Sequence, residues 1–293
     1  MIKKTLYFTR ECSLHLKDCQ LKIHFRDDNS SRSVPVEDIG YIVLENPLIS
    51  ITTPLIAALS ENNVSVVFTD RNMMPISMLM PFEGNSIQQE VYRSQIGASL
   101  PLNKRLWQQL VTAKIINQSL LLDKIGLDGS TIKPYSKNVK SGDSDNREGT
   151  AAKAYWPILF GNSFSRDRYG DAPNNMLNYG YSILRAATAR AIVGSGLLPL
   201  VGIFHKNRYN SFPLADDLME PFRPFVDEIV YYLFENGEKE LTTDVKRHLL
   251  EVLTCDTKYD ESVKPLAIGL STTTASLVKC YKGDTDKLVL PVL

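Results

Sequence analysis

The spacing of hydrophobic residues divides the chain into two parts with different periods. Apolar and polar residues alternate over 13–25, which predicts a β-hairpin, while the continuous apolar runs at 39–44 and 64–68 predict buried strands. Between these runs, Thr53 is predicted as the N-cap of a helix and Pro54 as its first residue. We therefore expect a small β-rich domain over residues 1–75.

From residue 86 onward the apolar positions follow helical spacing. The longest such segment, 102–125, carries leucine and isoleucine near every third or fourth position, and we expect Lys104, Arg105, Lys114 and Lys124 on its other faces. The pattern predicts an α+β chain in which residues 76–85 link the β-rich domain to a larger, all-helical domain over 86–293. Further helices are predicted at 88–99, 147–159, 174–193, 214–220, 225–235, 243–253 and 262–282.

Two segments interrupt the helical pattern. Residues 126–146 are polar and rich in Gly, Ser, Asp and Lys, and a loop of this length in a compact domain is typically mobile or functional. Residues 287–293 (KLVLPVL) are apolar and are expected to dock on a partner or to cover the domain.

The composition is that of an ordinary globular protein, with 43% hydrophobic and 23% charged residues. No apolar run approaches the roughly 18 residues of a membrane helix. Arg10 and Glu11 interrupt the N-terminal segment, so it does not resemble a secretory signal, and we expect a cytoplasmic protein without a membrane partner. The four cysteines lack CxxC spacing and are expected to be free thiols.

Charge is distributed unevenly although the net charge is zero. Residues 101–223 hold 16 basic and 10 acidic residues, whereas 1–100 have a net charge of −2 and 224–293 a net charge of −4. Because salt confines electrostatic fields to about 8–10 Å, a locally basic surface is enough to attract phosphates. The middle of the chain is therefore the best candidate for contact with a nucleic acid.

Candidate chemistry lies in the same region, in the stretch LVGIFHKNRYNSFPLADDLMEPFRP at 200–224. His205 closes an apolar run, and Asp216, Asp217 and Glu220 follow at helical spacing, so that Glu220 can share a face with either aspartate. Glu148, in the first turn of a predicted helix, is a candidate for a further acid. Carboxylates with an imidazole suit Mg²⁺ or Mn²⁺. A solvated acidic face and a structural histidine explain these residues equally well.

Other common catalytic patterns are missing from the sequence. It contains no GxSxG, no Walker A motif, no GxGxxG and no HExxH. These absences disfavour a serine hydrolase, a P-loop enzyme, a dinucleotide-binding enzyme and a zinc protease of the known motif classes.

Three blocks carry a family resemblance. EGTAAKAYW at 148–156, NNMLNYGYSILRAATARAIVGSGLLPLVGIFH at 174–205 and LADDLMEPFRPFVD at 214–227 resemble, in order and separation, the CRISPR-associated spacer-acquisition integrase and endonuclease family. The β-rich domain followed by a helical one also resembles that family, and the compact length resembles its type II branch.

The resemblance implies roles for individual residues. It assigns the metal ligands to Glu148, His205 and Glu220, makes Asp217 an additional acid of the catalytic site, and leaves Asp216 as a bystander. The implied ion is Mg²⁺ or Mn²⁺. Candidate DNA-contacting residues, each of which either orients a phosphate or holds helices together, are Arg166, Arg168, Asn178, Tyr181, Lys206, Arg208 and Arg223.

The activity that the resemblance implies is insertion of short DNA fragments into a CRISPR array. The 3′-hydroxyl ends of a double-stranded fragment are joined to the repeat by transesterification, as part of antiviral defence. The implied partners are double-stranded DNA, a second copy in a homodimer, and a small second adaptation protein that bridges two dimers. The β-rich domain and the methionine-rich segment 73–80 are our candidates for the dimer contact. The alternatives are a non-catalytic DNA-binding scaffold and a generic metallophosphoesterase.

Overall fold

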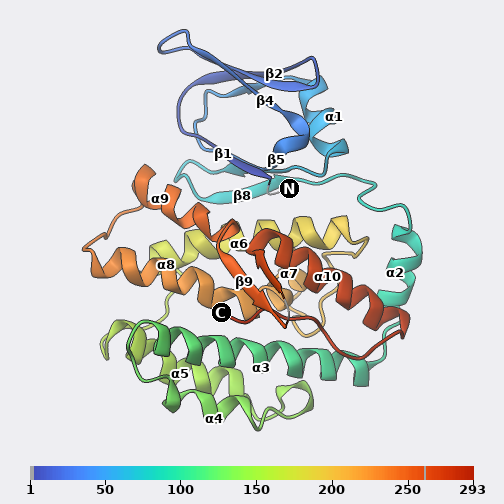
Figure 1. Cartoon of the computed structure of the whole chain (residues 1–293), viewed down its shortest axis with the longest axis vertical. Coiled ribbons are helices and arrows are strands. Elements are labelled where there is room, and N and C mark those ends of the chain that lie inside the picture. The colour runs from blue at the N-terminus through green and yellow to red at the C-terminus, as the bar shows by residue number, and fades with distance from the viewer. Residues whose placement is uncertain (1–2, 261) are drawn as a thin grey trace. The chain divides into compact units, whose positions relative to one another are not determined.

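The computed structural model describes residues 3–260 and 262–293, which form two compact units divided between Gly84 and Asn85 (Figure 1). The first is built mainly of strands and the second mainly of helices. The prediction of an α+β chain with an N-terminal β-rich part followed by a helical part is confirmed.

The first unit contains two four-stranded sheets. One has the order β1-β5-β7-β8, in which β1, β5 and β7 are parallel and β8 is antiparallel to β7. Strand β5, which lies between β1 and β7, is buried at all six positions, as a continuous apolar run predicts. The strands of this sheet are β1 (Lys4–Phe8), β5 (Ile39–Leu44), β7 (Ser65–Thr69) and β8 (Pro75–Leu79).

The second sheet has the order β4-β3-β2-β6 and contains the predicted hairpin. Leu14, Leu21, Leu55 and Val66 lie in one core that joins both sheets and helix α1 (Thr53–Glu61). The residue before this helix, Thr52 rather than Thr53, is its N-cap. The strands are β2 (Cys12–Lys17), β3 (Gln20–Phe25), β4 (Ser31–Pro35) and β6 (Ser50–Ile51), and the short 3-10 helix η1 (Val36–Asp38) precedes β5.

Strand β8 occupies part of the segment that the sequence pattern interprets as a connection. Its residues pair with β7 from Val66 to Thr69, so 76–79 belong to a sheet and the first unit extends to Gly84. No position of this edge strand (PISML) is buried, so its sequence lacks the apolar and polar alternation of a half-buried strand.

Helix α6 (Asn174–Gly194) is the most buried helix of the second unit, with 15 buried residues, and α7, α8, α9 and α10 pack against it. Small side chains permit this close packing: a Cβ atom added to Gly180 would lie 2.4 Å from Val226 Cγ1. The other α-helices with six or more residues in the described part of this unit are α2 (Gln88–Ile96), α3 (Leu100–Lys124), α5 (Arg147–Phe160), α7 (Pro213–Leu218), α8 (Arg223–Glu235), α9 (Thr243–Leu250) and α10 (Leu266–Lys282).

Helix α3, shown in green in Figure 1, extends along one side of the helical unit beside α5. The segment 126–146, predicted as a polar loop that is mobile or functional, folds against it as a series of short helices. Ser119 of α3 donates a hydrogen bond to Gly129 O, and Gln108 donates one to Val139 O. These pieces are η2 (Gly129–Thr131), α4 (Lys133–Ser136) and η3 (Ser141–Asp143).

The helical unit also contains a short β-hairpin, so the prediction of an all-helical domain is wrong in this detail. β9 (Asp256–Tyr259) pairs with β10 (Ser262–Pro265), and α10 starts only after this hairpin rather than at residue 262. The 3-10 helices η4 (Glu220–Phe222) and η5 (Glu251–Leu253) complete the unit.

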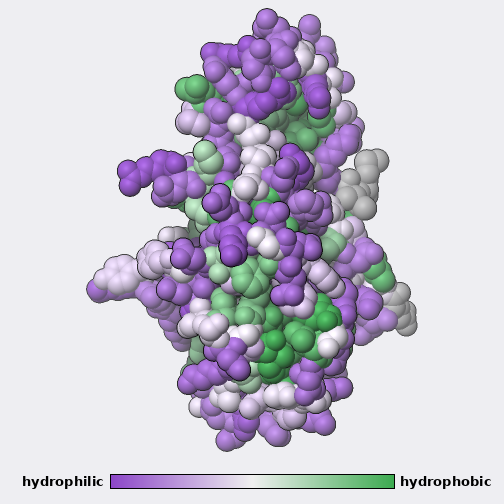
Figure 2. Space-filling model, turned by 90° about the vertical axis from the view of Figure 1, so that its left-hand side faces the viewer, coloured by the Kyte–Doolittle hydropathy of each residue, from purple (hydrophilic) through white to green (hydrophobic). Residues whose placement is uncertain are grey.

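The surface on the side drawn in Figure 2 is largely hydrophilic, with a hydrophobic area on the helical unit. Within the described residues, no helix has both the length and the apolar character needed to cross a membrane.

Candidate functional site

Two predicted metal ligands lie on either side of one buried lysine. Lys114, in the middle of α3, places its Nζ atom 2.6 Å from Glu148 Oε1 and 2.6 Å from Glu220 Oε2. The two carboxylate oxygens therefore cannot be farther apart than twice 2.6 Å. Three elements meet at this point, because Glu148 comes from α5 and Glu220 from η4.

The position of Glu148 follows from the way α5 begins. The side chain of Asn146 caps the helix by accepting a hydrogen bond from the N–H of Gly149. The Asp143 carboxylate accepts bonds from the N–H groups of Arg147 and Glu148, at 2.7 and 3.1 Å. This double cap fixes the first turn of α5, which carries Glu148.

Glu220 is almost completely buried, with 3% of its surface exposed. Burial by itself raises the pKa of its carboxyl, but the cations of Arg223 and Lys114 outweigh burial, so the pKa lies below its ordinary value. Arg223 Nε is 2.9 Å from Oε1. Lys114 Nζ lies 2.6 Å from Oε2 and forms an ion pair with it.

His205 is held by Asp217, which is fully buried on α7. The Asp217 carboxylate accepts a hydrogen bond from ring Nδ1 at 2.6 Å and from the backbone N–H groups of Ile203, Phe204 and His205. The hydrogen bond with Asp217 is the main reason why the pKa of His205 is raised. Because Nδ1 carries the bonded proton, Nε2 is left as the ring atom that can bind a metal ion.

Aromatic rings fix the loop that carries His205. Phe204 stacks on Trp107 of α3 with ring centroids 4.3 Å apart and an angle of 2° between planes. The imidazole of His205 meets the same indole edge-on at 5.7 Å. Trp107 is fully buried, so it provides a rigid support for this loop.

The structure separates the two aspartates that sequence spacing could not distinguish. Asp216 accepts hydrogen bonds from Arg185 and Asn210, both at 2.7 Å. Asp217 alone holds the histidine. The helical spacing between Glu220 and the aspartates does not apply in the structure. Helix α7 ends at Leu218, and Glu220 lies on the following 3-10 helix η4.

A buried polar cluster adjoins the site. Asp227 of α8 accepts hydrogen bonds from the hydroxyl groups of Tyr155 and Tyr181. Burial raises the pKa of Asp227 to about 6. The guanidinium of Arg223 lies over the Tyr181 ring at 4.5 Å while its Nε contacts Glu220, so this cluster supports one of the two carboxylates.

The predicted DNA-contacting residues fall into an internal and an exposed group. Arg166 donates hydrogen bonds to Asn174 and Asn178, and Asn178 donates one to Arg168 O, so both side chains hold the loop before α6. Tyr181 is buried and Arg223 is engaged with Glu220. Three predicted residues have exposed side chains available for a ligand: Arg168, Lys206 and Arg208.

The donor set fits a hard divalent cation. The Glu148 and Glu220 carboxylates both contact one cationic group, and an imidazole with a fixed orientation lies close enough to Glu220 for their charges to interact. Within 3–260 and 262–293, no three His, Cys, Asp or Glu side chains gather closely enough to enclose an ion. Mg²⁺ needs no such cage, because it keeps several waters and binds proteins through one or two carboxylates.

Sequence reasoning missed Lys114 and Asp227. Lys114 was expected on an outer face of its helix, but it is only 9% exposed. Its spacing held the signal: it lies four residues after Leu110 and seven before Leu121, both of which are buried on the same face. Asp227 lies in the third resemblance block, yet nothing in that block indicated its partners.

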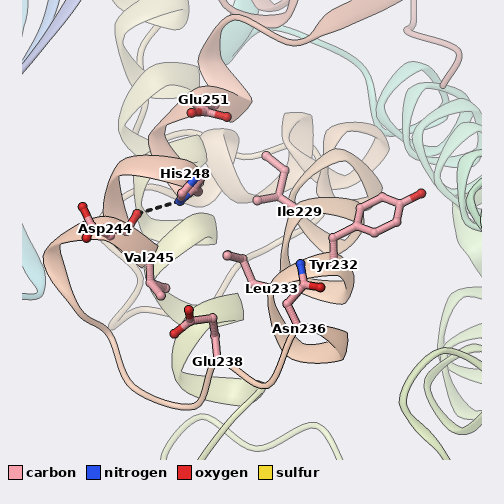
Figure 3. A pocket seen from close by; sticks show the side chains of 9 residues that line it. All are labelled: Ile229, Tyr232, Leu233, Asn236, Glu238, Asp244, Val245, His248 and Glu251. Atoms are coloured by element: carbon pink, nitrogen blue, oxygen red, sulfur yellow. Dashed lines mark hydrogen bonds between the residues drawn. The ribbon is translucent and has the colours of Figure 1, made fainter.

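The pocket in Figure 3 lies elsewhere in the helical unit. It has a volume of about 340 Å³ and lies between the end of α8 and α9, where apolar residues such as Ile229, Leu233 and Val245 share the lining with polar and charged ones such as Asn236 and Glu238. Its histidine, His248, bonds through Nδ1 to the backbone oxygen of Asp244. None of the predicted site residues lines it, so this pocket is separate from the Lys114 cluster.

Comparison with known proteins identifies the family. The model of the family "CRISPR associated protein Cas1" matches residues 6–255. The chain belongs to the Cas1 family. It is 38% identical, over 98% of its length and 94% of the relative's, to a CRISPR-associated endonuclease Cas1 of Neisseria meningitidis serogroup C (strain 8013). The family predicted from the three sequence blocks is confirmed.

Solved structures show how widely this Cas1 fold is shared. A casposase bound to its integration product matches with a TM-score of 0.81 and 24% identity, over 99% of this chain and 93% of that chain. A chain of a Cas6-RT-Cas1–Cas2 complex matches with a TM-score of 0.74 and 19% identity, over 97% of this chain and 35% of that one.

Proposed function

We propose that the chain is a metal-dependent DNA integrase and endonuclease of CRISPR adaptation, which joins the 3′-hydroxyl ends of short double-stranded DNA to the repeat of an array. The observation that carries the proposal is the convergence of Glu148 and Glu220 on one cationic position, beside an imidazole whose orientation is fixed. The Neisseria relative named an endonuclease supports the nuclease class.

Glu148, His205 and Glu220 are the proposed metal ligands. Mg²⁺ or Mn²⁺ bound there would polarise the target phosphodiester and favour loss of the proton from the attacking hydroxyl. Glu148 and Glu220 supply the negative charge that holds the ion. Asp217 keeps the Nδ1 proton of His205 in place, so that Nε2 presents its lone pair.

In the proposed reaction one phosphodiester bond is exchanged for another. The 3′-hydroxyl oxygen of the incoming fragment forms a bond to the target phosphorus, and the bond from that phosphorus to the target's own 3′ oxygen breaks. The displaced oxygen takes up a proton and leaves as a new 3′-hydroxyl, so no nucleotide hydrolysis is needed. Water in place of the 3′-hydroxyl gives endonuclease cleavage.

The proposed partners are DNA, further copies of this chain and a small second protein. Two strands must be joined to insert one duplex, so at least two protomers have to act, and we propose a homodimer. The similarity to a chain of a Cas6-RT-Cas1–Cas2 complex supports a Cas2-type protein as the bridge between dimers. The exposed Arg168, Lys206 and Arg208 are proposed to bind phosphates, and the cytoplasm is the proposed location. The strong similarity to the Neisseria relative along the whole chain favours the compact, type II branch.

The test is joining of a labelled DNA duplex to a supercoiled plasmid, with Mg²⁺, Mn²⁺ or a chelator, and with and without the small partner. Glu148→Ala, His205→Ala and Glu220→Ala should each abolish joining, whereas Glu235→Ala, at an exposed acid of α8, should not. Metal-independent joining, or an active His205→Ala enzyme, would contradict the ligand assignment. DNA binding without joining would favour a scaffold, and turnover of a small phosphodiester alone would favour a generic phosphoesterase.

A further inference from the structure

The ammonium group of Lys114 lies where a divalent cation would have to bind. Its Nζ atom is within 2.6 Å of both Glu148 and Glu220, the two carboxylates proposed to hold the metal. A lysine this deeply buried is uncommon unless its charge is paired, and here two carboxylates pair it. The lysine and the metal ion therefore compete for one position.

The charges of the cluster support this competition. Glu148 and Glu220 carry two negative charges, and Lys114 and Arg223 carry two positive charges, so the cluster is neutral with the ammonium in place. A divalent ion added beside the ammonium would be repelled at short range in a poorly hydrated site. If the ammonium withdraws, the same carboxylates can bind the ion.

The lysine side chain is suited to such a movement. Arg223 also contacts Glu220, but through Nε, and its guanidinium lies over the Tyr181 ring, so it is held on two sides. Lys114 reaches the carboxylates at the end of a flexible four-carbon chain. The single Nζ atom at the end of this chain makes both contacts, with Glu148 and with Glu220.

We propose that Lys114 is an internal counter-cation that holds Glu148 and Glu220 together when no divalent ion is bound and is displaced when the ion enters. This inference rests on the proposed function, because it takes these glutamates as metal ligands. It also explains how the buried Glu220 carboxylate and the half-buried Glu148 carboxylate can lie together in the metal-free protein.

The test compares Mn²⁺ binding by the full-length, chelator-treated wild type and Lys114→Met, measured from the free Mn²⁺ signal in electron paramagnetic resonance. Methionine keeps the apolar stem and removes the competing charge. We expect Lys114→Met to bind Mn²⁺ at least tenfold more tightly. Thermal unfolding should show a lower Tm than wild type without metal, and a difference that narrows with saturating Mn²⁺.

Lys124→Met is the matched control, because Lys124 lies on the same helix and pairs with Glu228 at 2.7 Å, with half of its side chain exposed. This variant should bind Mn²⁺ as the wild type does. A Lys114→Met protein with equal or weaker Mn²⁺ affinity, or with a Tm deficit that Mn²⁺ leaves unchanged, overturns the inference. If the wild type binds no Mn²⁺, the proposed function itself is overturned.

A measurement on the wild type covers the case in which Lys114→Met does not fold. The buried ammonium should give a slowly exchanging ¹⁵N signal in NMR spectra of the chelator-treated protein. Calorimetry gives the Mg²⁺ concentration that saturates the protein. At this concentration, Mg²⁺ should shift or remove the ¹⁵N signal of the ammonium group. A signal that stays unchanged after calorimetric saturation means that the lysine keeps its position, and the inference is then wrong.

Discussion

His205 and Asp217 are joined by two hydrogen bonds, one from the imidazole Nδ1 and one from the histidine's own backbone N–H. The same carboxylate also accepts the N–H groups of the two preceding residues. One buried acid therefore determines both the path of the loop and the orientation of the ring. This explains how a histidine on a partly exposed loop can have a fixed direction.

The first prediction concerns Asp217→Asn. The asparagine side chain has no negative charge, and its NH₂ group would face backbone N–H groups that now donate to the Asp217 carboxylate. The free energy of unfolding should therefore fall by about 1–3 kcal/mol. The pKa of His205 should also fall towards its ordinary value, because the hydrogen bond with Asp217 is the main cause of its elevation. Chemical denaturation and NMR titration of the imidazole measure the two effects. A His205 pKa that does not change in the variant would refute this explanation.

The second prediction concerns the pH dependence of stability at Asp227. Burial raises the pKa of Asp227 to about 6 in the folded protein, from an ordinary value of 3.8. Between pH 3.8 and about 6, Asp227 is therefore protonated to a larger extent in the folded state than in the unfolded state. Asp227 should therefore make the protein less stable as the pH rises from about 4 to 6, by roughly 3 kcal/mol in total.

Comparison with Asp227→Asn isolates this effect, because asparagine does not titrate while the other carboxyl groups remain. Urea unfolding of both proteins at several pH values gives the difference in unfolding free energy. The wild type should lose stability relative to the variant as the pH rises through this interval. A difference that stays constant with pH would show that Asp227 has an ordinary pKa.

The third prediction tests the packing of α6 against α8. Gly180→Ala adds a Cβ atom that would lie 2.4 Å from Val226 Cγ1, so the helices must separate and stability should fall by about 1–3 kcal/mol. Val226→Ala removes the opposing methyl groups. The double variant should be destabilised by less than the sum of the two single changes, as measured by thermal or urea unfolding. Additive effects would mean that the two residues do not meet.

The fourth prediction concerns DNA affinity. Lys206 and Arg208 are exposed on the loop after His205, so Lys206→Ala with Arg208→Ala should weaken binding to all DNA sequences alike. If each contacts one phosphate, the slope of log affinity against log salt should become shallower by about two. Fluorescence anisotropy at several salt concentrations measures this slope. An unchanged slope would place the phosphate contacts elsewhere. Lys153→Ala, on α5, is the control and should leave the slope unchanged.

Much of the helical unit could be predicted because its helices are long and amphipathic. The start of α5 at Arg147 and that of α6 at Asn174 agree with the predicted positions, since helical spacing and end signals act locally. Strand β8 and the β9–β10 hairpin were missed. They are short, and their strand character depends on partner strands rather than on a pattern of their own.

For the candidate site, sequence patterns indicated residue types but not contacts. Spacing left Asp216 and Asp217 equivalent, and the hydrogen bonds of Arg185 and His205 distinguish them in the structure. Spacing alone also did not show that Lys114 turns inward, because a lysine at the edge of an apolar stripe can extend its charge to water. Its burial depends on Glu148 and Glu220, which lie far along the chain and come together only in the fold.

Helix α3 contributes Trp107, Lys114 and Asn117 to the surroundings of the site. Trp107 supports the loop of His205, and Lys114 contacts Glu220. Asn117 donates a hydrogen bond to the backbone oxygen of Pro221, the residue after Glu220. Inserting one residue between Trp107 and Lys114 would rotate everything beyond it by about 100° and shift it by about 1.5 Å. The site therefore depends on the number of residues between Trp107 and Lys114, and natural variation in this helix should preserve that number.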